Sequence, residues 1–160
     1  MKRILIAAAI AGAAALPAQS ATTSNNFNVS TSLSSQCQAT NSGSQTVDFG
    51  TYTAFQATPQ AGTSVNLLFQ CTRGFAPTSV AFDTVNGTAA GVGVLVGLQY
   101  SLSAGAASIV AGTAATTATI GTGDAVTYAV SGSMPANQAG ACATSACGPT
   151  SHVRTLIVTF

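Results

Sequence analysis

Hydrophobic residues recur at every second position over short segments of this chain, and no other feature constrains the fold as strongly. In the segment 64–71, Val65, Leu67, Phe69 and Cys71 fall on one side. The same spacing recurs in the segments 47–49, 80–82, 96–102, 126–130 and 156–160. Alternation of this kind is typical of β-strands with one buried face, whereas no segment after the first twenty residues has the spacing of an amphipathic helix.

Turn-forming residues separate these segments. The clearest turns are Thr58-Pro59-Gln60-Ala61-Gly62, Asn86-Gly87 and Gly121-Thr122-Gly123-Asp124, where proline and glycine provide the backbone angles that a chain reversal needs. The low-complexity stretch 104–122, with Ile109, Val110 and Ile120, is interpreted as a weak edge strand within a long surface connection. Short strands joined by glycine-rich connections predict an all-β, antiparallel β-sandwich.

The first residues have the pattern of a secretory signal peptide. Lys2 and Arg3 precede the apolar run 4–16, and small residues follow, so cleavage is expected after Ser20 or Ala21. A retained membrane anchor is the alternative, but the run is shorter than the roughly 20 residues of a spanning helix. We therefore expect residues 1–21 to be removed and the rest to be exported to the periplasm, then to the cell surface or an extracellular fibre.

Charge is scarce in this chain. Only 4% of its residues are charged, compared with roughly a quarter in an average soluble domain. After the predicted cleavage the charged residues are Asp48, Arg73, Asp83, Asp124 and Arg154, with no lysine. Such a chain has no basic surface for phosphates, so a nucleic-acid partner is not expected.

The residues needed for catalysis are equally scarce. His152 and one of Asp48, Asp83 or Asp124 could join a serine in a triad, but no serine lies in a nucleophile-elbow pattern, and we expect a histidine at a strand edge. Asp83 and Asp124 are interpreted as turn residues rather than calcium ligands. The sequence therefore predicts a protein that is not an enzyme, without catalytic residues, metal, cofactor or small-molecule substrate.

Four cysteines follow the predicted cleavage site: Cys37, Cys71, Cys142 and Cys147. An exported chain encounters an oxidising compartment, which favours two disulfides. Three pairings are possible from sequence alone. The simplest is Cys37 with Cys71 and Cys142 with Cys147. Metal or redox chemistry at 142–147 is the alternative, but the spacing is wider than in a Cys-x-x-Cys motif.

A further alternating segment lies directly after the cleavage site. Phe27, Val29, Thr31 and Leu33 alternate with Asn28, Ser30 and Ser32. This segment is either the first strand of the chain's own sandwich or a detached arm that adds a strand to another molecule. The pattern alone leaves both interpretations open.

In their order along the chain, several short motifs resemble the spore coat protein U domain family, which includes subunits of archaic (Csu-type) chaperone–usher pili. The matching stretches are Phe27-x-Val29 before Cys37, Val47-Asp48-Phe49-Gly50-Thr51-Tyr52, residues 65–74, Leu98-Gln99-Tyr100-Ser101-Leu102, the turn Gly132-Ser133-Met134-Pro135-Ala136-Asn137-Gln138, and the closing strand 155–160. The Cys142 and Cys147 loop departs from the family pattern. The resemblance covers nearly all of the chain after the cleavage site.

The resemblance implies an immunoglobulin-like sandwich that lacks its last strand, G. The sequence stops at Phe160, in an apolar alternating strand, so another chain would have to complete the fold. Family members receive that strand first from a periplasmic chaperone and then, at the outer-membrane usher, from the N-terminal arm of the next subunit. Here the expected donor strand is Phe27, Val29, Thr31 and Leu33, and the expected chaperone-facing strand is Leu156, Val158 and Phe160.

These expectations define the domains and the function. Residues 1–21 are the signal peptide, 22–34 the donor-strand arm and 35–160 the β-sandwich domain. The chain is expected to be a structural subunit of an exported surface fibre that supports adhesion or biofilm formation. A spore-coat or matrix protein that completes its own sandwich is one alternative, and a ligand-binding adhesin module is another.

Overall fold

The computed structural model describes residues 22–85 and 89–160, and within them all regular secondary structure is β. Residues up to 33 and residues 34–160 form two separate units. In the first unit, residues 22–33 carry no strand. The strands of the second unit are β1 (Cys37–Ala39), β2 (Gln60–Ala61), β3 (Val65–Cys71), β4 (Ser79–Phe82), β5 (Val92–Leu95), β6 (Leu98–Ala104), β7 (Ser108–Val110), β8 (Asp124–Met134) and β9 (Leu156–Thr159).

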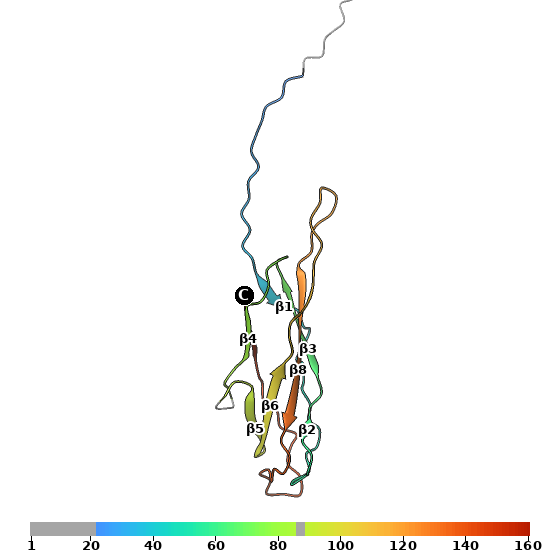
Figure 1. Ribbon diagram of the computed structural model, residues 1–160, viewed down its shortest axis with the longest axis vertical. Helices are drawn as coiled ribbons and strands as arrows, with labels where there is room; N and C mark the ends of the chain where they lie inside the picture. The colour runs from blue at the N-terminus through green and yellow to red at the C-terminus, as the bar shows by residue number, and fades with distance from the viewer. Residues whose placement is uncertain (1–21, 86–88) are drawn as a thin grey trace, which may run out of the picture. The chain divides into compact units, whose positions relative to one another are not determined.

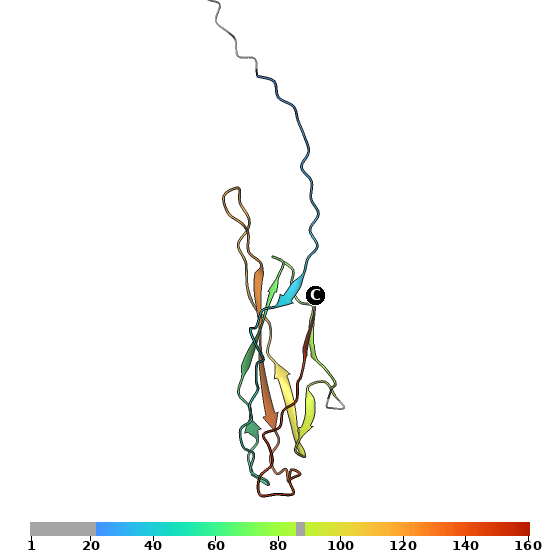
Figure 2. The same cartoon turned by 180° about the vertical axis from the view of Figure 1, so that it is seen from behind.

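The larger of two sheets is built around β8, the longest strand (Figure 1). Its order is β1-β3-β8-β6-β5, and β2 and β7 also pair with β8. All of these pairings are antiparallel, with Leu67 opposite Tyr128 and Leu102 opposite Gly132. The connection 111–123 between β7 and β8 is a hairpin that projects beyond the ends of the neighbouring strands (Figures 1 and 2).

The second sheet contains two strands, β4 and β9, paired antiparallel with Val80 opposite Val158. Alternate side chains of β9 pack against the larger sheet, so the two sheets form an antiparallel sandwich of the immunoglobulin-like kind. The predicted all-β, antiparallel fold is therefore confirmed. Strands were also correctly predicted at 65–71, at 80–82 and within 104–122, where β7 lies.

The hydrophobic core consists of two clusters. Cys71, Val126 and Tyr128 form the first, on which β9 packs. The second contains Leu98, Tyr100 and Met134, with Phe49 and Tyr52 against it. The inward positions of β8 are buried while the outward ones are largely exposed, which is the pattern expected for a sheet with one solvated face.

The strand predicted over 96–102 begins later than expected, at Leu98. Val96 and Gly97 have φ angles of 45° and 74° and form the two-residue turn of a hairpin in which Leu95 pairs with Leu98. Two positive φ angles are the geometry of a type I′ turn, usually occupied by Asn-Gly rather than Val-Gly. Because valine is common in strands, Val96 was predicted to belong to the strand rather than to a turn. Without a predicted turn at this point, β5 was not recognised as a separate strand.

Two other boundaries were wrong. The segment 47–49 forms no ladder, although Phe49 still packs on the second core cluster, because Thr63 rather than a strand holds the backbone of Asp48. The predicted turn 132–138 begins later, since Gly132 to Met134 continue β8 and pair with β6 and β2. The reversal itself occurs around Asn137, whose φ angle is 60°.

The predicted signal peptide, residues 1–21, and the predicted turn at Asn86-Gly87 lie outside the described residues. Across 22–85 and 89–160, no helix is long and apolar enough to cross a membrane.

Candidate functional site

The second sheet has only two strands, so in the described structure β4 and β9 each have one edge without a partner strand, and the edge of β9 is the candidate site. In the described structure β9 pairs with β4 on one side and has no partner strand on the other. Backbone N–H and C=O groups at an unpaired edge are ready to form a ladder with another strand. The three residues predicted to face a chaperone, Leu156, Val158 and Phe160, lie on the inward side of this strand, half-buried against the first core cluster.

The apolar inner face next to β9 is incompletely covered. Val65, Leu67 and Phe69 of β3 point inward but remain only half-buried. Phe75, in the connection after β3, stacks on Phe160 with ring centroids 5.8 Å apart. A two-stranded sheet is too narrow to bury the inner face of a sheet of seven strands, so this side of the sandwich has room for another strand.

The residues predicted to donate a strand are strongly exposed. Phe27, Val29 and Leu33 are 84%, 87% and 79% exposed, and Thr31 is exposed as well. Large apolar side chains are seldom so exposed in a consecutive alternating series, and such a series is typical of an interaction segment. The structure places these four residues in an extended segment without strand partners.

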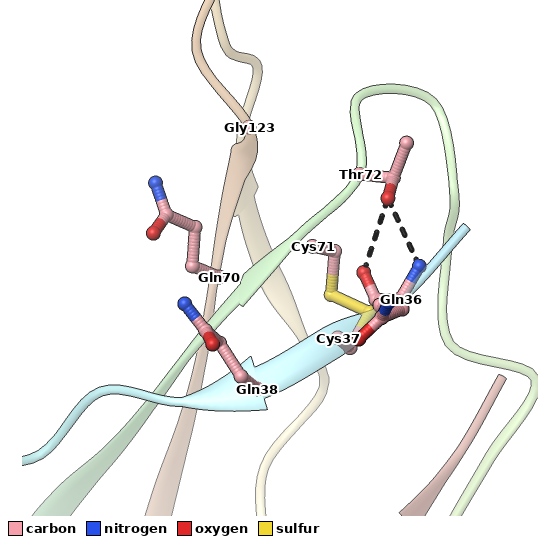
Figure 3. A pocket seen from close by; sticks show the side chains of 7 residues that line it. All are labelled: Gln36, Cys37, Gln38, Gln70, Cys71, Thr72 and Gly123. Atoms are coloured by element: carbon pink, nitrogen blue, oxygen red, sulfur yellow. Dashed lines mark hydrogen bonds between the residues drawn. A yellow bond between two sulfur atoms is a disulfide. The ribbon is translucent and has the colours of Figure 1, made fainter. Parts of the chain in front are cut away.

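A disulfide lies at the start of the folded unit. Cys37 bonds Cys71, as expected for the simplest pairing, and joins β1 to β3. Beside it is a groove of about 250 Å³, in which Gln38 and Gln70 lie opposite each other on neighbouring strands (Figure 3). Thr72 closes one end, since its hydroxyl accepts a hydrogen bond from the Gln36 amide, at 2.9 Å. The groove is polar and uncharged, and its residues are suited to holding β1 on β3 rather than to catalysis.

The second predicted disulfide, Cys142 with Cys147, is also present and closes an exposed loop. This loop borders an open cavity of about 520 Å³ that is also lined by Tyr52 and Leu98. The Tyr52 hydroxyl donates to the Pro135 carbonyl at 2.7 Å, so it serves to fix the turn after β8. Two disulfides indicate an oxidising compartment, either extracellular or periplasmic.

A buried ion pair joins the ends of the two strands of the second sheet. Arg154, just before β9, contacts Asp83, just after β4, at 2.7 Å, and their side chains are 7% and 12% exposed. The same guanidinium donates to the Val92 carbonyl of β5 and to the Tyr100 hydroxyl of β6, both at 2.9 Å. The Thr155 amide donates to the second carboxylate oxygen of Asp83. This network attaches the β4–β9 sheet to the far edge of the larger sheet.

The protonation of Asp83 depends on this network. Burial raises the pKa of its carboxyl, but the hydrogen bonds from Arg154 and Thr155 outweigh that effect, and the pKa lies below its ordinary value. His152 is half-buried, and its Nδ1 lies 3.1 Å from the Tyr100 hydroxyl. The same hydroxyl accepts a hydrogen bond from Arg154, so His152, Tyr100 and Arg154 are joined in one network. The histidine therefore belongs to a structural network that the sequence did not reveal.

Asp124 was wrongly predicted to be a turn residue. It is the first residue of β8, and its carboxylate is buried and accepts hydrogen bonds from the Gly74 and Gly112 amides at 2.8 and 2.7 Å. The hydrogen bond from the Gly112 amide, and next that from the Gly74 amide, lower the pKa of the Asp124 carboxyl. The residue ties the base of the projecting hairpin to the turn after β3. No sequence spacing signals this, because the two partners are backbone groups from distant loops.

The residues of the rejected catalytic interpretations are not assembled into a reactive site. The hydrogen-bond partners of Asp83, Asp124 and His152 are the structural ones given above, and the Asp48 carboxylate caps the Gly50 amide at 2.8 Å. Among the described residues, no three histidine, cysteine or acidic side chains are grouped as metal ligands would be. The open edge of β9 with the uncovered inner face is thus the feature with the clearest capacity to bind.

Comparison with known proteins gives no relative: no family model matches the chain, and no curated protein or solved structure resembles it significantly.

Proposed function

We propose that this chain is a structural subunit of an exported surface fibre, in which subunits are joined by donor-strand exchange and which supports adhesion or biofilm formation. The observation that carries the proposal is the open edge of β9 beside an incompletely covered apolar face. The family resemblance of the sequence supports the same mechanism. In this proposal the partner that occupies the edge is residues 22–34 of another copy.

The arm has the chemistry that the open edge requires. An added strand forms backbone hydrogen bonds with the edge, and alternate side chains enter the space between the sheets. Phe27, Val29 and Leu33 have the necessary period of two and are exposed in the isolated chain. Burying three such side chains contributes about 4.5 to 9 kcal/mol, at 1.5 to 3 kcal/mol each, in addition to the ladder.

The geometry of such a contact leads to a fibre. The arm and the edge are different surfaces of the same molecule, so each copy offers one of each. A head-to-tail contact of this kind propagates unless its rotation closes a ring. A periplasmic chaperone would protect the edge before assembly, and an outer-membrane usher would exchange it for the arm. Both partners, and export through the signal peptide, belong to this proposal.

A pair of charge substitutions in the arm tests the mechanism. Val29→Asp puts a carboxylate on the side of the arm that would be buried, whereas Ser30→Asp puts the same charge on the opposite side. We expect Val29→Asp to abolish oligomers that resist dilution and Ser30→Asp to leave them intact, because burying an unpaired charge is prohibitive. The oligomers are measured by gel electrophoresis without heating and by electron microscopy.

Binding of the arm to the open edge can also be tested with the arm as a separate peptide. A synthetic peptide of residues 24–34 should raise the Tm of a variant lacking residues 22–33, and the same peptide with Val29→Asp should not. The proposal is wrong if both arm variants polymerise equally. It is also wrong if the exported chain is a cooperatively melting monomer whose stability falls when Val29 is changed, since that outcome identifies the self-completed sandwich.

A further inference from the structure

The outer face of the larger sheet consists of side chains on β3, β5, β6, β7 and β8 that point away from the β4–β9 sheet. The strand register defines it: Asn66 lies opposite Ala129, and Leu68 opposite Thr127. Leu68, Val94 and Val110 are 41%, 53% and 66% exposed. The larger apolar side chains therefore reach solvent on both sides of the central strand.

Among the described residues, no strand position on this face carries a charged side chain. Of the acidic and basic residues in the described structure, Asp83 and Arg154 form a buried pair at the ends of β4 and β9, and Asp124 points inward. Asp48 and Arg73 lie outside the strands, and Arg73 donates to the Gly112 carbonyl at 3.1 Å, beyond the ends of β3 and β7. The outward positions are instead occupied by Ala, Ser, Thr, Asn, Gln, Leu and Val. Solvated sheets usually carry charges, which keep copies of a protein apart.

The face is also shaped for close approach. Along β8 the outward residues are small, with Ala125, Thr127 and Ala129 in the middle of the sheet. Leu68 lies beside Thr127 on one flank, and Val110 lies beside Ala125 on the other. Small residues between two larger flanks form a shallow trough, which a similar surface can fill when two sheets stack about 10 Å apart.

Some of the hydroxyls on this face already have partners within it, which lowers the cost of burying them. The hydroxyl groups of Ser103 and Ser131 are 2.9 Å apart and bond each other across β6 and β8. The Ser101 hydroxyl donates to the Ser133 carbonyl at 3.5 Å. Polar groups that are already paired within the face do not lose a water partner on association, which removes the main penalty for covering them.

We infer that this outer face is a second self-association surface, which docks onto the same face of another copy. A charged partner, a nucleic acid or an anionic membrane would find no complementary charge on it, whereas two uncharged, small-residue faces suit each other. A two-fold contact brings each residue near its own counterpart. The inference goes beyond the proposed strand exchange and does not depend on it, because the arm takes no part.

The dimensions of the face predict a weak contact. At about 3.4 Å per residue, the 11 residues of β8 extend about 35 Å, and four strands about 4.8 Å apart span less than 20 Å. The face thus offers about 500–700 Å² per copy, below the roughly 800 Å² of a standard interface. One such contact is transient, but many in parallel along a fibre would hold two fibres side by side.

Substitutions of Ala129, in the middle of the face, test this inference. In the full exported chain we expect reversible self-association at high concentration, measured by sedimentation velocity. Ala129→Lys should weaken it at least ten-fold at low salt, because the two lysines repel across the two-fold axis, and added salt should restore part of it. Mixing the Ala129→Lys and Ala129→Asp proteins should restore association that neither shows alone.

The matched control is Ala81→Lys, which adds the same charge on the exposed side of β4 and should leave association unchanged.

Strand-exchanged polymers persist on dilution, whereas sheet-face dimers dissociate, so the two contacts are measured separately. Far-ultraviolet circular dichroism and Tm establish that each variant is folded, and the Ala129→Asp protein provides a second variant if one does not fold. The inference is overturned if the wild type stays monomeric at millimolar concentration, if Ala129→Lys associates normally, or if the mixed proteins fail to associate.

Discussion

Arg154 pairs with Asp83 within the second sheet and donates to Val92 and Tyr100 of the larger one, so its guanidinium should contribute strongly to the stability of the sandwich, and Arg154→Met tests this. Methionine keeps much of the side-chain length but removes four interactions, two with Asp83 and one each with Val92 and Tyr100. The Asp83 carboxylate, only 12% exposed, would retain the Thr155 amide as its partner. Breaking a buried pair in this way costs about 3–5 kcal/mol, since an uncompensated charge remains.

Equilibrium unfolding in urea, followed by tyrosine fluorescence because the chain has no tryptophan, measures this loss. In a domain of this size the loss corresponds to a decrease in Tm of roughly 10–20 °C. Adding Asp83→Asn to Arg154→Met should recover part of the stability, because the stranded charge is gone. If Arg154→Met lowers the free energy of unfolding by less than about 1 kcal/mol, the reasoning is refuted, because a solvent-exposed ion pair contributes no more than that.

The pH dependence of the same pair has a definite sign. The native pKa of Asp83 lies below its ordinary value of 3.8, so the carboxylate stabilises the fold above that pH, and its contribution is lost as the pH falls through the lower native pKa. In Arg154→Met the burial that raises the pKa remains and the guanidinium that lowers it is gone. The stability difference between wild type and Arg154→Met should therefore shrink below about pH 4. A difference that stays constant from pH 7 to pH 3 would contradict this assignment.

Three further predictions concern other parts of the fold. Loop-closure entropy predicts that removing the Cys37–Cys71 disulfide costs about 4 kcal/mol and removing Cys142–Cys147 about 2 kcal/mol, which urea unfolding of the Cys→Ala pairs measures. Gly93→Ala should lower the free energy of unfolding by about 1–3 kcal/mol, because its Cβ would collide with the ring and hydroxyl of a buried tyrosine, while Gly105→Ala, with its nearest neighbour at 3.6 Å, should cost less than half as much. Asp124→Asn should speed hydrogen exchange of the two glycine amides that its carboxylate holds, and unchanged protection would show that they are held by other means.

The strands that could be predicted from sequence are those whose period of two is long and unbroken. β3 lies within one residue of its predicted range, 64–71, because one face of 65–71 is apolar throughout. β5 was missed since the turn after it, Val96-Gly97, lacks the usual turn residues and is held by pairing across the hairpin. The segment 47–49 alternates, but three residues are too few to distinguish a strand from a loop by pattern. In the structure it is a loop in which the Asp48 amide donates to the Thr63 hydroxyl.

The residues of the candidate site divide in the same way. The apolar inward residues of β9 were recognisable from their spacing, as were the cysteines, whose nearest-neighbour pairing proved correct. The Arg154–Asp83 network was not recognisable, because its members are 71 positions apart and meet only when β4 pairs with β9. The role of Asp124 was hidden for a related reason, since its partners are backbone amides.

The sequence by itself determined that this chain forms short antiparallel strands with one apolar face, closed by two disulfides and almost free of charge. Those properties are local, because side-chain period, turn residues and composition act over a few neighbouring positions. Only the tertiary structure decided which strands share a sheet, that β9 has an open edge, and that the uncharged outward residues gather on one continuous face. Each of these depends on the pairing of segments distant in sequence, where register and sheet order are set by packing across the whole core.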